Sequence, residues 1–206
     1  MWALIKDNKI EEMYRFPKSI ILNNVRYPSN MFTKYTDSEK EAIGIYPVLD
    51  NGTKGDDKFE NTDGPTYTFD AANKRVTTAY TITERKLDDT TTNEKDYKGN
   101  AIINLGLKSE AKNLAKKRAN DLIKRFNWLV ERYTYDNSKT IPNVVSTYVG
   151  NIRNDCATIC TGIDDASDMT AFKKLYDWEF NADGSVKTVA PIQKWSDDYD
   201  VQAYIR

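Results

Sequence analysis

The sequence contains no histidine, and only two of its 206 residues are cysteines. Without histidine, the chain lacks the commonest general base, the Ser–His and Cys–His nucleophile arrangements, and every zinc site that uses an imidazole ligand. Cys156 and Cys160 alone are too few for a disulfide framework or a four-cysteine zinc site within one chain. Catalysis would have to depend on carboxylates, lysine, tyrosine or a hard metal ion, so we predict a non-enzymatic protein.

The sequence also has no excess of one charge sign and no long hydrophobic run. Thirty lysine and arginine residues stand against 31 aspartate and glutamate residues, a formal net charge of -1, so the basic excess typical of nucleic-acid binding is lacking. No stretch approaches the roughly 18 consecutive apolar residues of a membrane span. The opening residues, MWALIKDNKIEEMY, contain no apolar core and no small-residue cleavage site, so no signal peptide is predicted. We expect a soluble protein made in a cytoplasm.

The pattern of short β-rich and helical segments predicts an α+β fold. Hydrophobic residues make up 39% of the chain, enough for one or two modest cores. Three regions are expected: a small N-terminal α+β module over residues 1–49, a polar and β-rich middle over 50–105, and a C-terminal helical region with an extended tail over 106–206.

In the N-terminal module, turn-forming residues separate the expected elements. These are strand pairs on either side of residues 7–9 and 23–24, a helix over 38–43 that Gly44 ends, and a strand over 45–48. Thr36 or Asp37 is the expected helix cap. Because Pro47 cannot donate a ladder hydrogen bond, the strand over 45–48 is predicted at a sheet edge.

The middle region alternates polar tracts with β-rich segments. Residues 50–65 are almost wholly turn formers and charges, which predicts a long exposed loop. Residues 66–70 and 76–85 carry alternating apolar, threonine and tyrosine residues and are predicted to form two strands. Residues 88–100 are again polar and are predicted to be a flexible linker.

The C-terminal region shows helical periodicity. The expected elements are a helix from an N-cap at Ser109 to about Phe126, a second from Ile141-Pro142 to Gly162, a third capped by Ser167, a hairpin turn over 180–186, and twenty extended residues at the end. Residues 128–134 are compatible with a longer first helix or with a short extended segment. The second helix has a predicted apolar stripe of Val145, Tyr148, Val149, Ile152, Cys156, Ile159 and Cys160.

Few residues are candidates for chemistry. Cys156 and Cys160 are four residues apart, so they share one helix face, where core packing is favoured over a metal or redox pair. Residues 179–184 resemble the start of a calcium-binding loop, but positions nine and twelve are Lys187 and Ala190, so a hairpin turn is favoured. Carboxylates also collect in residues 50–63, without ligand spacing.

The first long helix has a basic outer surface, which could contact phosphate. It comprises Lys112, Lys116, Lys117, Arg118, Lys124 and Arg125. Glu110, Asp121 and Glu131 interrupt it, and charge on the outer face of an amphipathic helix is the ordinary expectation. Nucleic acid is therefore not an expected partner. Catalytic, cofactor-binding and metal-ligating residues are predicted to be absent.

Two stretches resemble proteins of tailed bacteriophages. The first comprises Val25-Arg26-Tyr27-Pro28, the helix from Ser38 to Gly44, and the closing residues Gly44 to Val48, and it resembles a small N-terminal module of phage tail proteins. The second resembles the ending of tail-fibre and tail-assembly proteins. It comprises the basic helix from Lys112 to Lys124, Asn127-Trp128 to Arg132, Ile141-Pro142 to Arg153, the run from Leu175 to Gly184, and Trp195.

This resemblance implies a structural component of a virion tail (a tail-fibre, adaptor or baseplate-associated protein) that is synthesised in the host cytoplasm. Its expected partners are other phage tail proteins and further copies of itself. Thirteen tyrosines and four tryptophans agree with protein–protein contacts. The alternative is a tail or tail-fibre assembly chaperone that is absent from the mature virion. A polysaccharide-cleaving tail enzyme is less favoured, because no pair of carboxylates stands out.

Overall fold

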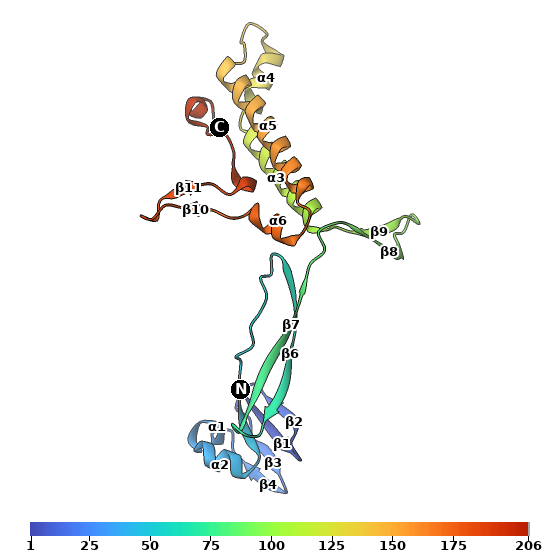
Figure 1. The fold of residues 1–206 in the computed structure, drawn as a ribbon, viewed down its shortest axis with the longest axis vertical. Coiled ribbons are helices and arrows are strands. Elements are labelled where there is room, and N and C mark those ends of the chain that lie inside the picture. The colour runs from blue at the N-terminus through green and yellow to red at the C-terminus, as the bar shows by residue number, and fades with distance from the viewer. Residues whose placement is uncertain (206) are drawn as a thin grey trace. The chain divides into compact units, whose positions relative to one another are not determined.

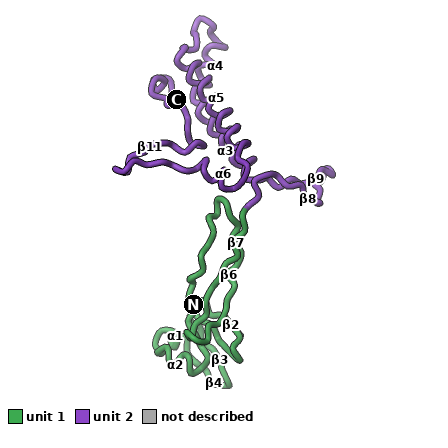
Figure 2. Tube along the Cα trace, in the orientation of Figure 1, with its two compact units in different colours: residues 1–84 green, residues 85–206 purple. Residues whose placement is uncertain are grey.

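The computed structural model describes residues 1–205, and the chain divides into two compact units, residues 1–84 and 85–206 (Figure 2). Helices account for 36% of the residues and strands for 28%, so the predicted α+β class is confirmed. The division between the units falls inside the region 50–105, which the sequence analysis treated as one β-rich middle.

Unit 1 is built on a five-stranded sheet with the strand order β2-β1-β5-β7-β6 (Figure 1). Its strands are β1 (Trp2–Lys6), β2 (Lys9–Tyr14), β5 (Ile45–Leu49), β6 (Glu60–Asp70) and β7 (Arg75–Glu84). All neighbours in the sheet are antiparallel except β5 and β7, which run parallel. The sheet therefore joins two hairpins, β1–β2 and β6–β7, through one intervening strand.

The predicted turns of the first module are confirmed. Asp7 and Asn8 both have positive φ, as do Asn23 and Asn24 between β3 (Ile20–Leu22) and β4 (Val25–Tyr27). Two successive positive φ angles are what a tight hairpin turn requires, and asparagine and aspartate tolerate them best among non-glycine residues.

Two helices follow, α1 (Met31–Lys34) and α2 (Asp37–Ala42). The Thr36 side chain caps α2 by accepting a hydrogen bond from the Glu39 amide, and the Glu39 carboxylate accepts one from the Thr36 amide. Such a capping box satisfies two backbone donors at the helix start. Gly44, at φ +82°, then turns the chain into β5.

The core of unit 1 lies between the sheet and α1. Its buried side chains are Leu4, Tyr14, Ile20, Met31, Phe32 and Ile45. The Phe32 ring lies 4.9 Å from that of Trp2 and 5.4 Å from that of Tyr14, centroid to centroid.

Two sequence predictions for unit 1 were wrong. β5 is a central strand, because Ile45–Pro47 pair with β1 while Val48 and Leu49 pair with β7. Pro47 fits there because it is the last residue paired with β1, at the point where the strand changes partner. Residues 60–65, assigned to a loop, belong to β6, where residues 60–63 pair with residues 81–84 of β7. Cross-strand pairing overrides the turn-forming composition.

Unit 2 contains a pair of long helices, α3 (Leu107–Lys124) and α5 (Asn143–Asp165), linked through α4 (Asn127–Tyr135). The preceding hairpin consists of β8 (Thr90–Lys95) and β9 (Ala101–Asn104). The chain continues after α5 with α6 (Met169–Lys174), the hairpin β10 (Glu179–Phe180) and β11 (Val186–Thr188), and two 3-10 helices, η1 (Pro191–Gln193) and η2 (Tyr199–Tyr204).

The core of unit 2 lies where α3, α4, α5 and η2 meet. Its buried side chains are Ala119, Leu122, Phe126, Leu129, Val145, Tyr148, Ile152 and Val201. The indole Nε1 of Trp128 donates a hydrogen bond to the Tyr204 carbonyl at 3.0 Å, which ties the C-terminal segment to α4. The Arg125 guanidinium forms an ion pair with Asp198 at 3.1 Å. The predicted apolar stripe on α5 is confirmed for Val145, Tyr148, Ile152 and Ile159, which are all buried.

Several predicted boundaries in unit 2 were wrong. Residues 88–100 are not a linker, because most of them belong to the β8–β9 hairpin. Ser109 does not cap α3, which begins at Leu107 after Gly106. Residues 128–134 are helical, which settles the alternative left open. Helix α5 does not end at Gly162 but continues to Asp165, and Ile163, the residue after Gly162, is buried.

The last segments were also assigned differently. Asp168, and not Ser167, caps α6, because its side chain accepts a hydrogen bond from the Ala171 amide. The predicted turn between 180 and 186 is confirmed by the β10–β11 hairpin. The final residues, predicted to be extended and irregular, contain the two short helices η1 and η2.

Candidate functional site

The two cysteines lie on the α5 face that is turned toward α3. Both are half-buried and free, and Cys156 packs against the core of unit 2. Burial raises the pKa of the Cys156 thiol, and the neighbouring Cys160 raises it further. A raised pKa keeps the sulfur protonated near neutral pH, which disfavours both nucleophilic attack and metal ligation.

The carboxylates singled out in the sequence are occupied by local hydrogen bonds. Asp183 accepts from the Ser185 amide and hydroxyl, and Glu179 accepts from the Thr188 hydroxyl at 2.9 Å. In the 50–63 tract, Asp50 accepts from the hydroxyl of Thr78 at 2.9 Å. Across residues 1–205, no cluster of three or more His, Cys, Asp or Glu side chains could hold a metal ion.

The basic side chains of α3 do not form one continuous surface. Lys112 forms an ion pair with Asp164 at 2.6 Å, and Arg125 forms the ion pair with Asp198 described above. Lys117 and Lys124 are exposed on the outer side of the helix. Two of the six basic residues that the sequence pattern placed on this helix are thus paired with aspartates from the C-terminal half of unit 2.

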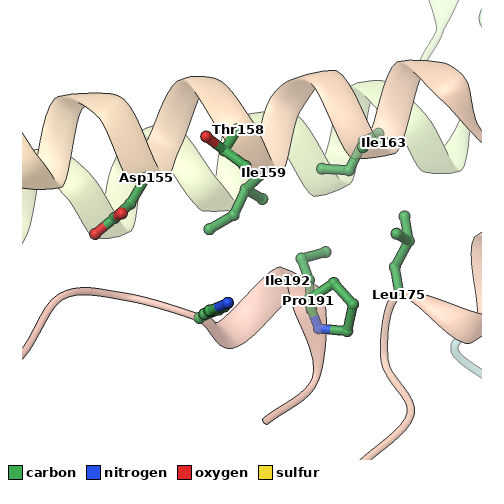
Figure 3. A pocket seen from close by; sticks show the side chains of 9 residues that line it. Asp155, Thr158, Ile159, Ile163, Leu175, Pro191 and Ile192 are labelled. Atoms are coloured by element: carbon green, nitrogen blue, oxygen red, sulfur yellow. The ribbon is translucent and has the colours of Figure 1, made fainter. Parts of the chain in front are cut away.

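A cavity of about 350 Å³ lies between α5 and the segment that runs from α6 to η1 (Figure 3). Ile159 and Ile163 line one wall, and Leu175 and Ile192 line the other. Asp155 is the one carboxylate in its lining, and it already accepts a hydrogen bond from the Ser196 amide at 2.7 Å. The cavity is therefore mainly an apolar gap beneath the C-terminal segment.

Two hairpins of unit 2 carry exposed apolar side chains. The β8–β9 hairpin exposes Ile103, at 57% of its surface, and Tyr97 at its turn, at 91%. The β10–β11 hairpin exposes Phe180 at 59%, together with Val186. Every residue of β9, β10 and β11 is exposed, and Figure 1 shows both hairpins extending away from the helices. In β8 only Thr90 and Thr92 are half-buried, and its other residues are exposed.

The β8–β9 hairpin is nonetheless anchored at its base. Asp89 accepts hydrogen bonds from the Gly106 amide at 2.7 Å and from the Ser109 hydroxyl at 3.0 Å, and these bonds lower the pKa of its carboxyl group. The amides of Leu107 and Lys108 donate to carbonyls of residues 86 and 87. The first turn of α3 therefore fixes where the hairpin leaves the helical part of the unit.

Sequence reasoning missed the β8–β9 hairpin. A signal for it exists: β-branched residues at 90–92 and 102–103 flank a turn at residues 96–100, in which Gly99 has positive φ. Asp96 closes this turn by accepting hydrogen bonds from the amides of Lys98 and Asn100. The polar composition of residues 88–100 concealed this pattern.

Comparisons with protein-family models, with curated proteins and with solved structures find no match for this chain. Among the described helices, none combines the length and the apolar character that crossing a membrane would require.

Proposed function

We propose that the chain is a structural component of a bacteriophage virion tail (a tail-fibre, adaptor or baseplate-associated protein) that acts through protein–protein contacts. The observation that carries this proposal is the pair of hairpins in unit 2, in which every residue of β9, β10 and β11 is exposed. The sequence resemblance to phage tail proteins supports the particular setting.

An isolated two-stranded hairpin is only marginally stable in water, and it normally needs further strands or a helix packed on it. Ile102, Ile103 and Leu105 in and after β9 are all exposed. Covering such side chains contributes about 1.5–3 kcal/mol for each one that is fully buried. A neighbouring subunit would supply that cover. Contacts of this kind suit a protein that is built into an assembly, including one made of several copies of itself.

The cavity of Figure 3 gives little support to the polysaccharide-cleaving alternative. Glycoside hydrolysis commonly uses two carboxyl groups about 5–10 Å apart. Asp155 is the single carboxylate in the lining of this cavity, and the Ser196 amide already binds it. Asp155 therefore holds the C-terminal segment against α5, and the lining of this cavity offers no second carboxyl group.

Mass spectrometry of purified virions tests the proposal. We expect the chain in stoichiometric amounts relative to other tail proteins, and we expect cryo-electron microscopy of the particle to place it in the tail. A chain that is abundant in the lysate but absent from purified particles would refute the virion component and favour the assembly chaperone. The matched control is a known tail protein of the same particle, quantified in both fractions.

A further inference from the structure

We propose that unit 2 makes a head-to-tail contact between copies of this chain. In this contact, the segment 177–188 of one copy, here called the arm, occupies an apolar groove of the next copy that the end of α3, α4 and α5 line. The inference rests on the proposed function and deepens it, because it identifies a second copy as the partner and assigns the two surfaces that meet.

The arm contains the β10–β11 hairpin and is acidic and aromatic. It has three carboxylates, Asp177, Glu179 and Asp183, and one basic residue, Lys187, and its net charge is therefore -2. Trp178 and Phe180 are both exposed large aromatic side chains. Such side chains are enriched among the residues that dominate binding energy at protein interfaces. Within the arm, Lys187 forms an ion pair with Glu179 at 3.4 Å. The arm thus offers exposed aromatic side chains on a segment of net negative charge.

The groove has the complementary character. It measures about 340 Å³, and its walls include Ile123, Phe126 and Val130 on one side and Val145 and Val149 on α5. Arg153 is the one charged residue in its lining, and no hydrogen bond or ion pair engages its guanidinium within residues 1–205. An unpaired arginine beside an apolar groove is suited to a carboxylate that flanks an aromatic ring.

The arm and the groove are two different surfaces of unit 2. The arm follows α6, and the groove lies beside α4 and the first half of α5. A contact between two different surfaces of this kind is heterologous, and its repetition produces a ring or a filament.

The experiment measures the mass of the purified full-length chain by light scattering after size-exclusion chromatography. We expect an assembly larger than a dimer. Phe180→Ala and Arg153→Glu should each weaken association by about tenfold or more and release the 23.7 kDa monomer. Tyr135→Ala and Lys117→Glu are matched controls, since both side chains are exposed and lie outside the arm and the groove. Circular dichroism confirms that each variant is folded.

Mixing the two disruptive variants gives the sharpest outcome. The Phe180→Ala chain retains a groove, and the Arg153→Glu chain retains an arm, so an equimolar mixture should form one-to-one dimers that do not grow further. A wild-type chain that stays monomeric at its highest soluble concentration would overturn the proposal. So would a mixture that remains monomeric, or a wild-type monomer that uses Phe180 to bind a different virion protein.

These results are separable from those that test the proposed function. A chain that is present in virions but monomeric when purified would refute the self-contact and leave the structural role intact. A chain that assembles through the arm and is absent from virions would refute the structural role and leave the self-contact intact.

Discussion

Replacing Ile152 with alanine should destabilise unit 2 strongly. Ile152 lies in the middle of α5 with 0% of its surface exposed, and it belongs to the core that α3, α4, α5 and η2 share. Truncating a fully buried isoleucine to alanine typically costs about 2–5 kcal/mol, because transfer free energy is lost and a cavity remains. We expect a cost in that range, since neighbours on several elements hold the cavity open.

Urea unfolding followed by far-ultraviolet circular dichroism measures this cost, because the long helices of the protein lie in unit 2. Leu114→Ala is the matched control: the substitution removes a side chain of the same size from α3, but 66% of Leu114 is exposed. We expect this control to change the free energy of unfolding by only about 0.5 kcal/mol. Measurements at two protein concentrations separate folding from association.

A loss below about 1 kcal/mol for Ile152→Ala would contradict the assignment of Ile152 to a close-packed core. Equal losses for Ile152→Ala and Leu114→Ala would also contradict it, since the two sites differ chiefly in burial.

Three further predictions concern local contacts. Thr36→Ala should lower the stability of unit 1 by about 1 kcal/mol in thermal unfolding, because the capping box with Glu39 is lost; an unchanged midpoint would contradict this role. The pKa of Asp89 is lowered in the folded chain, so its contribution to stability is present above its ordinary pKa and is lost as the pH falls through the lowered value. The NMR chemical shifts of the Asp89 carboxyl carbon and the Gly106 amide should therefore change together with pH, with a midpoint below the ordinary aspartate pKa range. A midpoint within that range would contradict this. Burial raises the pKa of Cys156, so iodoacetamide should alkylate it more slowly in the folded chain than in urea, as followed by mass spectrometry; equal rates would rule this out.

The parts of the fold that sequence predicted well depend on short-range signals. The turns at residues 7–8 and 23–24 require positive φ, and the asparagine and aspartate residues there tolerate it. The stripe on α5 could be read because the three- and four-residue spacing of its apolar residues places them on one helix face. The class of the fold follows from such local patterns.

The errors have a common physical origin in contacts between distant residues. Residues 60–63 became a strand through pairing with residues 81–84, and β5 became central because β7 pairs with its second half. Helix α5 passes Gly162 because Ile163 is buried, and that burial stabilises another turn. None of these partners can be read from the local sequence.

The candidate surfaces were even less accessible to sequence reasoning. An apolar residue such as Ile103 or Phe180 looks the same in sequence whether it is buried or exposed, and only the fold shows that both are exposed. Arg153 belonged to a resemblance motif, but its place beside a groove depends on the packing of α4 against α5. The aromatic content indicated an interaction protein without locating the surface.

The segment between β5 and β6 and the edge strand β6 both limit where a further strand could pair with the sheet of unit 1. The Gly52 amide donates a hydrogen bond to the Thr78 hydroxyl, and Thr78 in turn donates to Asp50, so this segment lies along the side of β7 beyond its short pairing with β5. Strand β6 carries Glu60, Asp63 and Pro65 and an irregularity in its register. Charges, proline and irregular pairing all discourage unwanted sheet growth. These features of β6 disfavour the addition of a further strand at that edge of the sheet.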